Sequence, residues 1–313
     1  MGKYLVTGGA GFIGSNLCEV LVMRGDRVRV LDDLSTGRLE NLHTFMDRIE
    51  FIHGCIENPN DVRRAADGID TVVHLAAIPS VVHSVEDPVS TDRVNIHGTL
   101  QLLLAARDAR VRRVVFASSC AVYGEDETLP KTESMLPAPA SPYALSKLAG
   151  EHYCALFSHL YGLSTISLRL FNIFGPRQDP SSPYSGVISI FIERMLQRQR
   201  PTICGDGEQS RDFTYVANVI AAILSADQYE SASGQVVNIG TGKRNSVKEL
   251  YAVIQKLTGF DQTPLFADAR PGDVRHSEAQ IALAQELLGY RPSVDFHDGL
   301  KMTLAFFTSR RGA

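Results

Sequence analysis

The sequence predicts an α/β fold built around a doubly wound parallel sheet, with a smaller C-terminal domain that interleaves with it. Two observations predict this fold. Short apolar runs of strand length alternate with segments of helical periodicity, and a glycine-rich turn separates the first run from the first helix. At 313 residues, the chain is long enough for one large or two moderate domains.

The first strand is expected at residues 4–7 and the first helix at residues 15–24. Between them, Gly8, Gly11 and Gly14 form a G-x-x-G-x-x-G pattern, a spacing variant of the dinucleotide-binding fingerprint. Glycines here permit a tight turn, close approach of the backbone to a pyrophosphate, and close packing of the helix on the strand. The helix N-terminus would then face the phosphates of a dinucleotide.

The second strand, at residues 28–31, is followed by Asp32, eighteen residues past Gly14. An acidic side chain at this place can accept hydrogen bonds from both ribose hydroxyls of adenosine and would repel a 2′-phosphate. The pattern therefore predicts NAD rather than NADP as the cofactor. The alternative is a glycine-rich turn followed by a solvated aspartate.

The alternation of strands and helices continues along the chain. Further strands are expected at residues 50–53, 71–75, 113–117 and 236–240, and further helices at residues 60–67, 92–109, 142–161 and 246–258. The late strand at 236–240 should return to the main sheet. We therefore expect a Rossmann domain over residues 1–178 and a substrate domain over residues 179–313, with residues 212–242 partly returning to the first.

Tyr143 and Lys147 lie one helical turn apart on one face of the helix that should start at Ser141 and Pro142. An unperturbed tyrosine has a pKa of ~10, so a phenolate base at neutral pH requires about 4 kcal/mol. An ammonium about 5.5 Å away supplies roughly 3 kcal/mol at an effective dielectric of about 20. A second positive charge, such as an oxidised nicotinamide ring, would close the gap. Taken alone, this spacing also occurs by chance on many helix surfaces.

Ser118 and Ser119 follow the fifth expected strand, at the edge where doubly wound sheets bind their ligands. A serine pair at a strand end is often only a helix cap or a turn. Here it shares a chain with Tyr143 and Lys147, so we expect a functional serine at this position.

Composition excludes several classes of function. The net charge of -4 gives no basic surface for nucleic acid or for an anionic membrane. The five cysteines are widely spaced and form no C-x-x-C pair, which suggests neither a disulfide framework nor a metal site. We recognise no signal peptide and no apolar run of membrane-spanning length, so we expect a cytoplasmic protein.

Several motifs together resemble one enzyme family. They are the glycines at 8–14, Asp32, Ser119 with Tyr123 and Gly124, Tyr143, Lys147 and the run 169–172. In this order they resemble the extended short-chain dehydrogenase/reductases, specifically the nucleotide-sugar 4-epimerases. Residues 171–180, 205–207 and 211–213 are most similar to the UDP-N-acetylglucosamine 4-epimerase type of bacterial surface-polysaccharide pathways.

The resemblance implies a catalytic mechanism. Tyr143, as a phenolate, would take the proton of the sugar 4-hydroxyl while C4 passes a hydride to NAD, and Ser119 would share the hydrogen bond. Lys147 would hold the nicotinamide ribose and favour ionisation of Tyr143. The 4-keto sugar would then turn over and take the hydride back on its other face. A UDP-sugar is thus the implied substrate, and a homodimer formed through two helices per subunit, residues 92–109 and 142–161, is the implied assembly.

The resemblance also assigns binding residues. Those implied for NAD are Gly8, Gly11, Phe12, Ile13, Gly14, Asp32, Asp33, Ser35, Thr36, Gly37, Cys55, Ile56, Leu75, Ala76, Ala77, Asn95, Tyr143, Lys147 and Phe171. Those implied for the UDP-sugar are Ser119, Tyr143, Asn172, Val187, Arg211, Arg270 and Ser277. Guanidinium groups suit diphosphate oxygens, although Arg211 and Arg270 could instead form surface ion pairs.

Four residues qualify this resemblance. Cys55 stands where relatives usually carry an aspartate facing adenine, so one hydrogen bond to the base could be missing. Cys120 and Ala121 stand where related dehydratases carry an acid pair and related decarboxylases a glutamate, which disfavours chemistry beyond C4. Ser277 is small where relatives restricted to plain hexoses tend to carry tyrosine, and this favours a 2-acetamido sugar.

We therefore expect an NAD-dependent 4-epimerase acting on UDP-GlcNAc and UDP-GalNAc, and also on UDP-Glc and UDP-Gal. The alternatives are an epimerase restricted to UDP-glucose or specific for UDP-glucuronic acid, and, more remotely, a UDP-sugar 4,6-dehydratase or decarboxylase. An ordinary dehydrogenase would release NADH stoichiometrically. An inactive NAD-binding regulator would have lost Ser119, Tyr143 or Lys147, and all three are present.

Overall fold

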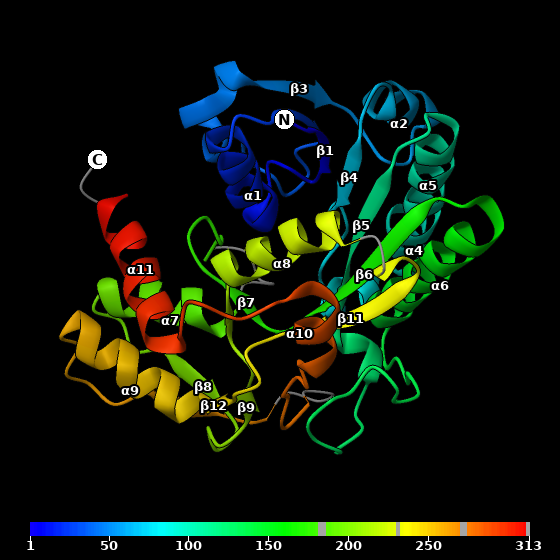
Figure 1. Ribbon diagram of the computed structural model, residues 1–313. Coiled ribbons are helices and arrows are strands. Elements are labelled where there is room, and N and C mark those ends of the chain that lie inside the picture. Colours follow the sequence, from blue (N-terminus) through cyan, green and yellow to red (C-terminus); the bar gives the residue numbers. More distant parts are fainter. Residues whose placement is uncertain (181–185, 230–231, 270–273, 311–313) are drawn as a thin grey trace.

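The computed structural model describes residues 1–180, 186–229, 232–269 and 274–310. Its centre is a seven-stranded sheet with the strand order β11-β6-β5-β4-β1-β2-β3 (Figure 1). The strands are β1 (Lys3–Thr7), β2 (Arg27–Asp32), β3 (Ile49–His53), β4 (Thr71–His74), β5 (Arg113–Ser119), β6 (Ser164–Leu170) and β11 (Gln235–Ile239). Every neighbouring pair is parallel. The strand order reverses between β1 and β4, which is where such sheets bind ligands.

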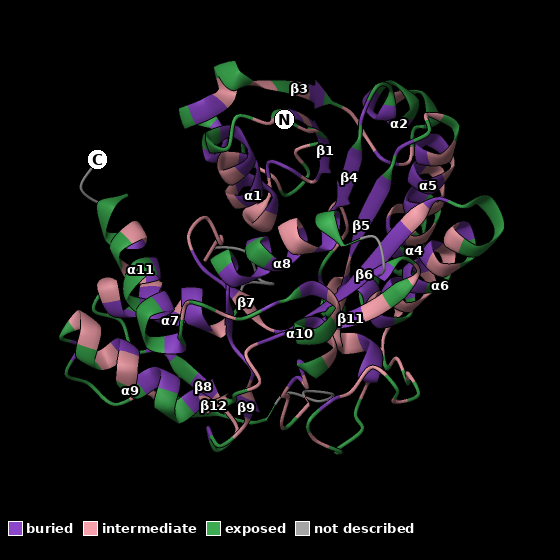
Figure 2. Ribbon diagram, in the orientation of Figure 1, coloured by how far each residue is buried: buried purple, intermediate pink, exposed green. Residues whose placement is uncertain are grey.

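Helices cover both faces of the sheet, as the doubly wound prediction requires. Alternate residues of a strand point to opposite faces, so Leu5 packs with α2 (Pro59–Ala66), α5 (Gly98–Asp108) and α6 (Pro142–Tyr161). Val6 packs on the other face with α1 (Phe12–Met23) and α8 (Val216–Gln228). The inner strands β1, β4, β5 and β6 are buried along most of their length, whereas the edge strand β3 is largely not (Figure 2).

The smaller part of the chain carries helices α7, α9 and α11, which gather beside the main sheet (Figure 1). Their bounds, with those of the remaining helices, are α3 (Val81–Glu86), α4 (Pro88–Asp92), α7 (Val187–Leu196), α9 (Val247–Thr258), α10 (Ala282–Leu288) and α11 (Phe296–Ser309). The short strands pair as β7 (Ile173–Phe174) with β10 (Thr214–Tyr215), β8 (Thr202–Cys204) with β13 (Leu265–Ala267), and β9 (Ser210–Arg211) with β12 (Asn245–Ser246). Between them, α8 and β11 return to the main sheet.

Two expected helices differ in the structure. The first begins at Phe12 rather than at Ser15, because Gly11 is already the extended N-cap residue. The helix expected at 92–109 is divided into α4, a π-helical turn (Arg93–His97) and α5. In contrast, the helix expected at 246–258 is confirmed as α9, which starts with a capping box formed by Ser246 and Glu249.

No helix in the described part of the chain is both long and apolar enough to cross a membrane.

Candidate active site

The glycine turn after β1 is packed too tightly for side chains. Gly8 has a φ of +69°, and a Cβ there would lie 2.8 Å from the backbone nitrogen of Ala76. A Cβ on Gly14 would lie 2.2 Å from the carbonyl oxygen of Gly8. No side chain caps the start of α1, so its first N–H groups can donate hydrogen bonds to a bound anion. This cradle fits the pyrophosphate of NAD.

Asp32 ends β2 beside the glycine turn and is only 7 % exposed. Its carboxylate accepts hydrogen bonds from the backbone N–H groups of Ala10 (2.9 Å) and Leu34 (2.8 Å). Burial raises the pKa of this carboxyl group, and the two donors oppose that shift. Gly37 passes so close that a Cβ there would lie 2.7 Å from the Asp32 carboxylate. The predicted ribose acceptor is thus fixed between the two loops expected to hold adenosine.

The loop after β2 is ordered by Asp33, whose carboxylate accepts hydrogen bonds from the backbone N–H (2.9 Å) and the hydroxyl (2.6 Å) of Ser35. Thr36 and Gly37 complete this loop. The other residues predicted to bind the cofactor follow the carboxyl ends of further strands. Cys55 and Ile56 follow β3, Leu75 to Ala77 follow β4, and Phe171 follows β6. They therefore lie along the same edge of the sheet as the glycine turn.

Cys55 replaces the expected aspartate without leaving a free polar group. Its thiol donates to the Glu57 carboxylate (3.4 Å), and its backbone N–H donates to Asp61 (3.1 Å). Burial raises the pKa of the thiol, which therefore stays protonated at neutral pH. The neighbouring Ile56 is buried against Gly98 in the core.

Asn95 sits in the π-helical turn and is 3 % exposed. Its side chain accepts from the N–H of Ile78 (2.8 Å) and donates to the carbonyl of Ile78 (3.0 Å) and the hydroxyl of Ser146 (3.0 Å). Both amide protons are therefore used within the protein. Asn95 thus ties the loop after β4 to α6, and its side chain is used in these bonds rather than presented to a ligand.

The three predicted catalytic residues meet where β5 ends beside α6. The helix starts as expected, with Ser141 as the N-cap and Pro142 in the first turn. The hydroxyl of Ser119 lies near enough to the phenol of Tyr143 to lower its pKa. The ammonium of Lys147 donates to the carbonyl of Ala117 (2.8 Å) and lies 5.9 Å from the centroid of the Tyr143 ring.

Burial opposes charge on both members of the tyrosine–lysine pair. It raises the pKa of Tyr143 to about 12, while the hydrogen bond from Ser119 acts in the opposite direction. Burial also lowers the pKa of Lys147 to about 8. The neutral phenol is thus favoured in the chain alone. A further positive charge at this place is needed before Tyr143 can work as a base.

A second group of predicted residues gathers around Cys120. The nearby backbone N–H of Asn172, the charge of Arg211 and the hydroxyl of Ser277 each act to lower the pKa of its thiol. Burial outweighs them and raises the pKa of the thiol. The side-chain nitrogen of Asn172 is buried without an acceptor. An oxygen-rich ligand would satisfy this donor.

Arg211 is held by its Nη1, which donates to the carbonyls of Ser210 (2.9 Å) and Arg275 (3.1 Å). Ser277 is held by its N–H, which donates to the carbonyl of Ser210 (3.0 Å). Val187 is the first residue of α7 and packs against the core. Arg270 lies outside the described residues.

The sequence interpretation overlooked Asp212, which is fully buried next to Arg211. Its carboxylate accepts from the backbone N–H groups of Thr241 (2.8 Å), Gly242 (2.9 Å) and Ala279 (3.2 Å), and from the hydroxyl of Thr241 (2.6 Å). It therefore fixes the segment that contains Ser277. Its place in the Arg-Asp-Phe run was the only available signal.

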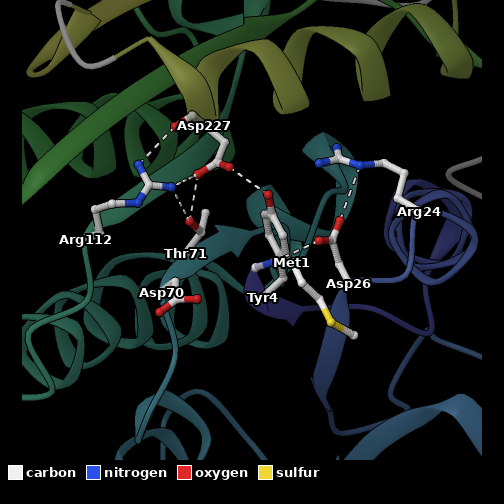
Figure 3. A pocket seen from close by; sticks show the side chains of 9 residues that line it. Met1, Tyr4, Arg24, Asp26, Asp70, Thr71, Arg112 and Asp227 are labelled. Carbon is white, nitrogen blue, oxygen red and sulfur yellow. Dashed lines mark hydrogen bonds and ion pairs between the residues drawn. The ribbon is translucent and has the colours of Figure 1, made fainter.

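A cavity of about 340 Å³ lies at the opposite, amino edge of the sheet (Figure 3). Asp227 from α8 is its central group and accepts hydrogen bonds from the hydroxyls of Tyr4 and Thr71, each at 2.7 Å. Arg112 forms an ion pair with the same carboxylate. These groups satisfy one another, and none adjoins Ser119 or Tyr143. The cavity marks where α8 is anchored to the sheet.

Comparisons with known proteins show the family to which the chain is similar. A model described as the NAD dependent epimerase/dehydratase family matches residues 4–240. The chain is 42% identical over 299 residues to a putative UDP-glucose 4-epimerase of Methanocaldococcus jannaschii, covering 95% of each chain.

Two solved structures are similar over nearly their whole length. The UDP-glucose 4-epimerase of Thermotoga maritima, solved with UDP-glucose, has a TM-score of 0.94 at 39% identity, with 98% of this chain and 99% of that chain covered. The UDP-N-acetylglucosamine 4-epimerase of Methanobrevibacter ruminantium, solved with UDP-N-acetylmuramic acid, has a TM-score of 0.94 at 37% identity, with 99% of each chain covered.

Proposed function

The chain belongs to the NAD dependent epimerase/dehydratase family, and from this we propose that it is a 4-epimerase that interconverts UDP-GlcNAc and UDP-GalNAc. It also accepts UDP-Glc and UDP-Gal in this proposal. The observation that carries the proposal is the meeting of Ser119, Tyr143 and Lys147 at one strand end, beside a wall formed by Cys120 and Ser277.

NAD is the cofactor, and when bound it supplies the reversible hydride acceptor for C4 of the sugar. The glycine turn would hold its pyrophosphate, and Asp32 would accept hydrogen bonds from its adenosine ribose. Tyr143 would take the proton of the 4-hydroxyl and later return it, and Ser119 would keep that proton on a short path. Lys147 would hold the nicotinamide ribose and stabilise the phenolate.

The substrate proposal rests on the group around Cys120. Ser277 is small and contacts the sulfur of Cys120, the residue that follows the catalytic serine. In this proposal, the small side chain leaves room for a 2-acetamido group on the sugar. The unpaired amide nitrogen of Asn172 would donate to the diphosphate or to the sugar. Arg211, and Arg270 by its motif, would bind the diphosphate.

The two residues after Ser119, Cys120 and Ala121, argue against lyase chemistry. Ala121 has no ionisable group, so it cannot act as the acid or base that expulsion of a C6 hydroxyl requires. Burial raises the pKa of the neighbouring Cys120 thiol, which is therefore a weak acid. The reaction would thus end at C4, with no net redox change.

A homodimer fits the exposed apolar side chains of three helices, α3, α4 and α6, which pack against one another. These side chains are Val82, Val85, Val89, Leu145, Leu156 and Leu160. A patch of this kind is typical of a protein interface. In this proposal α3 and α4 join the two helices, 92–109 and 142–161, expected from the resemblance. The five free thiols suit a cytoplasmic setting.

Proton NMR of the purified enzyme, incubated separately with UDP-GalNAc and UDP-Gal without added reductant, tests the proposal. Appearance of the gluco anomeric signal would establish 4-epimerisation, and the ratio of the two rates would measure the preference for the acetamido group. Conversion of UDP-Gal alone would leave a plain hexose epimerase. A 4-keto-6-deoxy product would contradict the argument from Ala121. If neither sugar changes, UDP-glucuronic acid is the next substrate to test.

A further inference from the structure

A buried ion pair lies two helical turns beyond Tyr143. Glu151 on α6 and Arg169 on β6 are each 3 % exposed. The guanidinium group donates twice to the carboxylate, from Nε to Oε1 (2.9 Å) and from Nη2 to Oε2 (2.7 Å). Such a bidentate pair fixes orientation as well as distance.

The carboxylate of Glu151 joins the three segments that carry the proposed site. Tyr143, Lys147 and Glu151 follow one another at intervals of four residues, and so lie along one face of α6. The hydroxyl of Ser118, the residue before Ser119, donates to the same carboxylate. Arg169 lies opposite Ser118 in the β5–β6 register and three residues before Asn172.

Further contacts hold the arginine on its other side. Its guanidinium carbon lies 4.7 Å from the centroid of the Tyr123 ring, and the Tyr123 hydroxyl donates to Asn238 on β11 (2.7 Å). The pair is thus enclosed between α6, β6 and the turn that follows Ser119. A shift of α6 along the sheet would break contacts on both partners at once.

Stability alone does not explain a pair in this place. The cost of removing two charges from water commonly matches or exceeds the attraction between them, and apolar residues of similar volume are often as stable. A fixed, bidentate pair provides geometry that apolar side chains do not. The element that requires exact geometry here is the contact between the Ser119 hydroxyl and the Tyr143 phenol.

We propose that Glu151 and Arg169 are positioning residues that set α6 against the end of β5, so that Ser119 and Tyr143 meet in the reactive arrangement. This inference rests on the proposed function of Ser119 and Tyr143. In the proposed reaction, neither Glu151 nor Arg169 contacts the reacting atoms. A displacement of about 1 Å in such an arrangement can lower turnover by about 100-fold.

The test compares three variants with the wild type, all saturated with NAD. Glu151→Gln breaks the charge pair. The double variant Glu151→Leu with Arg169→Met removes both charges and keeps an apolar fill. Asp227→Asn is the matched control, because its carboxylate also binds one arginine and accepts side-chain hydroxyls, but at the far edge of the sheet (Figure 3).

Two quantities are measured beside the melting temperature. One is kcat and KM for the better UDP-sugar. The other is the pKa of Tyr143, followed by the chemical shift of its ring Cζ in protein labelled at tyrosine and assigned with Tyr143→Phe. Lys147 and Cys120 are the titratable groups near this phenol, and none of the three variants alters them.

We expect both Glu151 variants to lose about 10- to 100-fold in kcat with KM within about 3-fold. The pKa of Tyr143 should rise by about 0.5 to 1 unit, the size of one lost hydrogen bond. Asp227→Asn should lower the melting temperature and leave kcat and this pKa unchanged. If Glu151→Gln does not fold, the double variant makes the same test.

An unchanged kcat and Tyr143 pKa in the double variant would overturn the proposal, and so would equal effects in Asp227→Asn. The pKa measurement does not depend on the sugar. A wild type that epimerises nothing, together with the expected pKa shift in the Glu151 variants, would therefore reject the proposed function and keep the positioning role.

Discussion

Gly14→Ala should weaken NAD binding, although a change from glycine to alanine within a helix is usually favourable. Gly14 is the third residue of α1, and alanine in a helix is ordinarily favoured over glycine by about 1 kcal/mol. Here the added Cβ would lie 2.2 Å from the carbonyl oxygen of Gly8 and 2.7 Å from the Cα of Gly9. Both are backbone atoms, so a change of side-chain rotamer cannot relieve the overlap.

The start of α1 and the glycine turn must therefore separate by about 1 Å to reach ordinary contact distance. Overpacking of this kind costs about 1 to 3 kcal/mol, which exceeds the helix preference. Because the strain falls on the turn proposed to hold the pyrophosphate, we expect the dissociation constant of NAD to rise about 10- to 100-fold. The melting temperature of the cofactor-free chain should fall by several degrees.

Calorimetric titration of NAD into cofactor-stripped protein measures the first effect, and thermal unfolding the second. Gly25→Ala is the matched control. Gly25 has a φ of +83° with no atom near a Cβ, so alanine there adds backbone strain away from the turn. It should lower the melting temperature and leave NAD affinity unchanged. Wild-type NAD affinity in Gly14→Ala would refute the packing argument.

Two further predictions concern the reaction and its substrate. Tyr143→Phe should fold normally and lose at least about 100-fold in kcat, measured by the NMR assay, because no group would remain to take the proton; substantial turnover would remove Tyr143 as the base. Ser277→Tyr should spare UDP-Gal and impair UDP-GalNAc when kcat/KM is compared for the two sugars, because the ring would fill the space beside Cys120. Equal losses on both sugars would contradict the pocket argument.

Local sequence was sufficient for most of the central sheet. Strands β1, β4 and β5 contain short apolar runs, β2 and β3 alternate apolar with polar residues, and the glycine turn is too crowded for a side chain. The π-helical turn was not predictable in this way. It places Asn95 against Ile78 and Ser146, which are distant in sequence, so its cause is tertiary.

The residues of the candidate site also fall into two groups, those predictable from local sequence and those placed by tertiary packing. Ser119, Tyr143 and Lys147 could be selected because each lies at a recognisable strand end or helix start. The contact of Ser277 with Cys120 depends on the return of the chain through β9, where Ser210 holds Ser277. The ion pair of Glu151 and Arg169 was missed because charged residues are usually exposed, and its burial follows only from the packing of α6 on β6.

The free-energy cost of burying the charged Lys147 can be measured directly. Burial lowers the pKa of Lys147 to about 8 from an ordinary value of 10.5, which corresponds to about 3 kcal/mol against the charged form. This penalty is fully present below the folded pKa and disappears as the pH rises through the unfolded pKa. Lys147→Met removes it but leaves the carbonyl of Ala117 without its donor, which costs about 1 kcal/mol.

At pH 7 the inactive variant should therefore be more stable than the cofactor-free wild type by about 2 kcal/mol in urea unfolding. The advantage should shrink as the pH rises from the folded to the unfolded pKa of the lysine. Lys131 is equally buried but paired with Asp126, so Lys131→Met should lose stability at pH 7. If Lys147→Met were also less stable than the wild type at pH 7, burial of the charged Lys147 would not destabilise the cofactor-free protein.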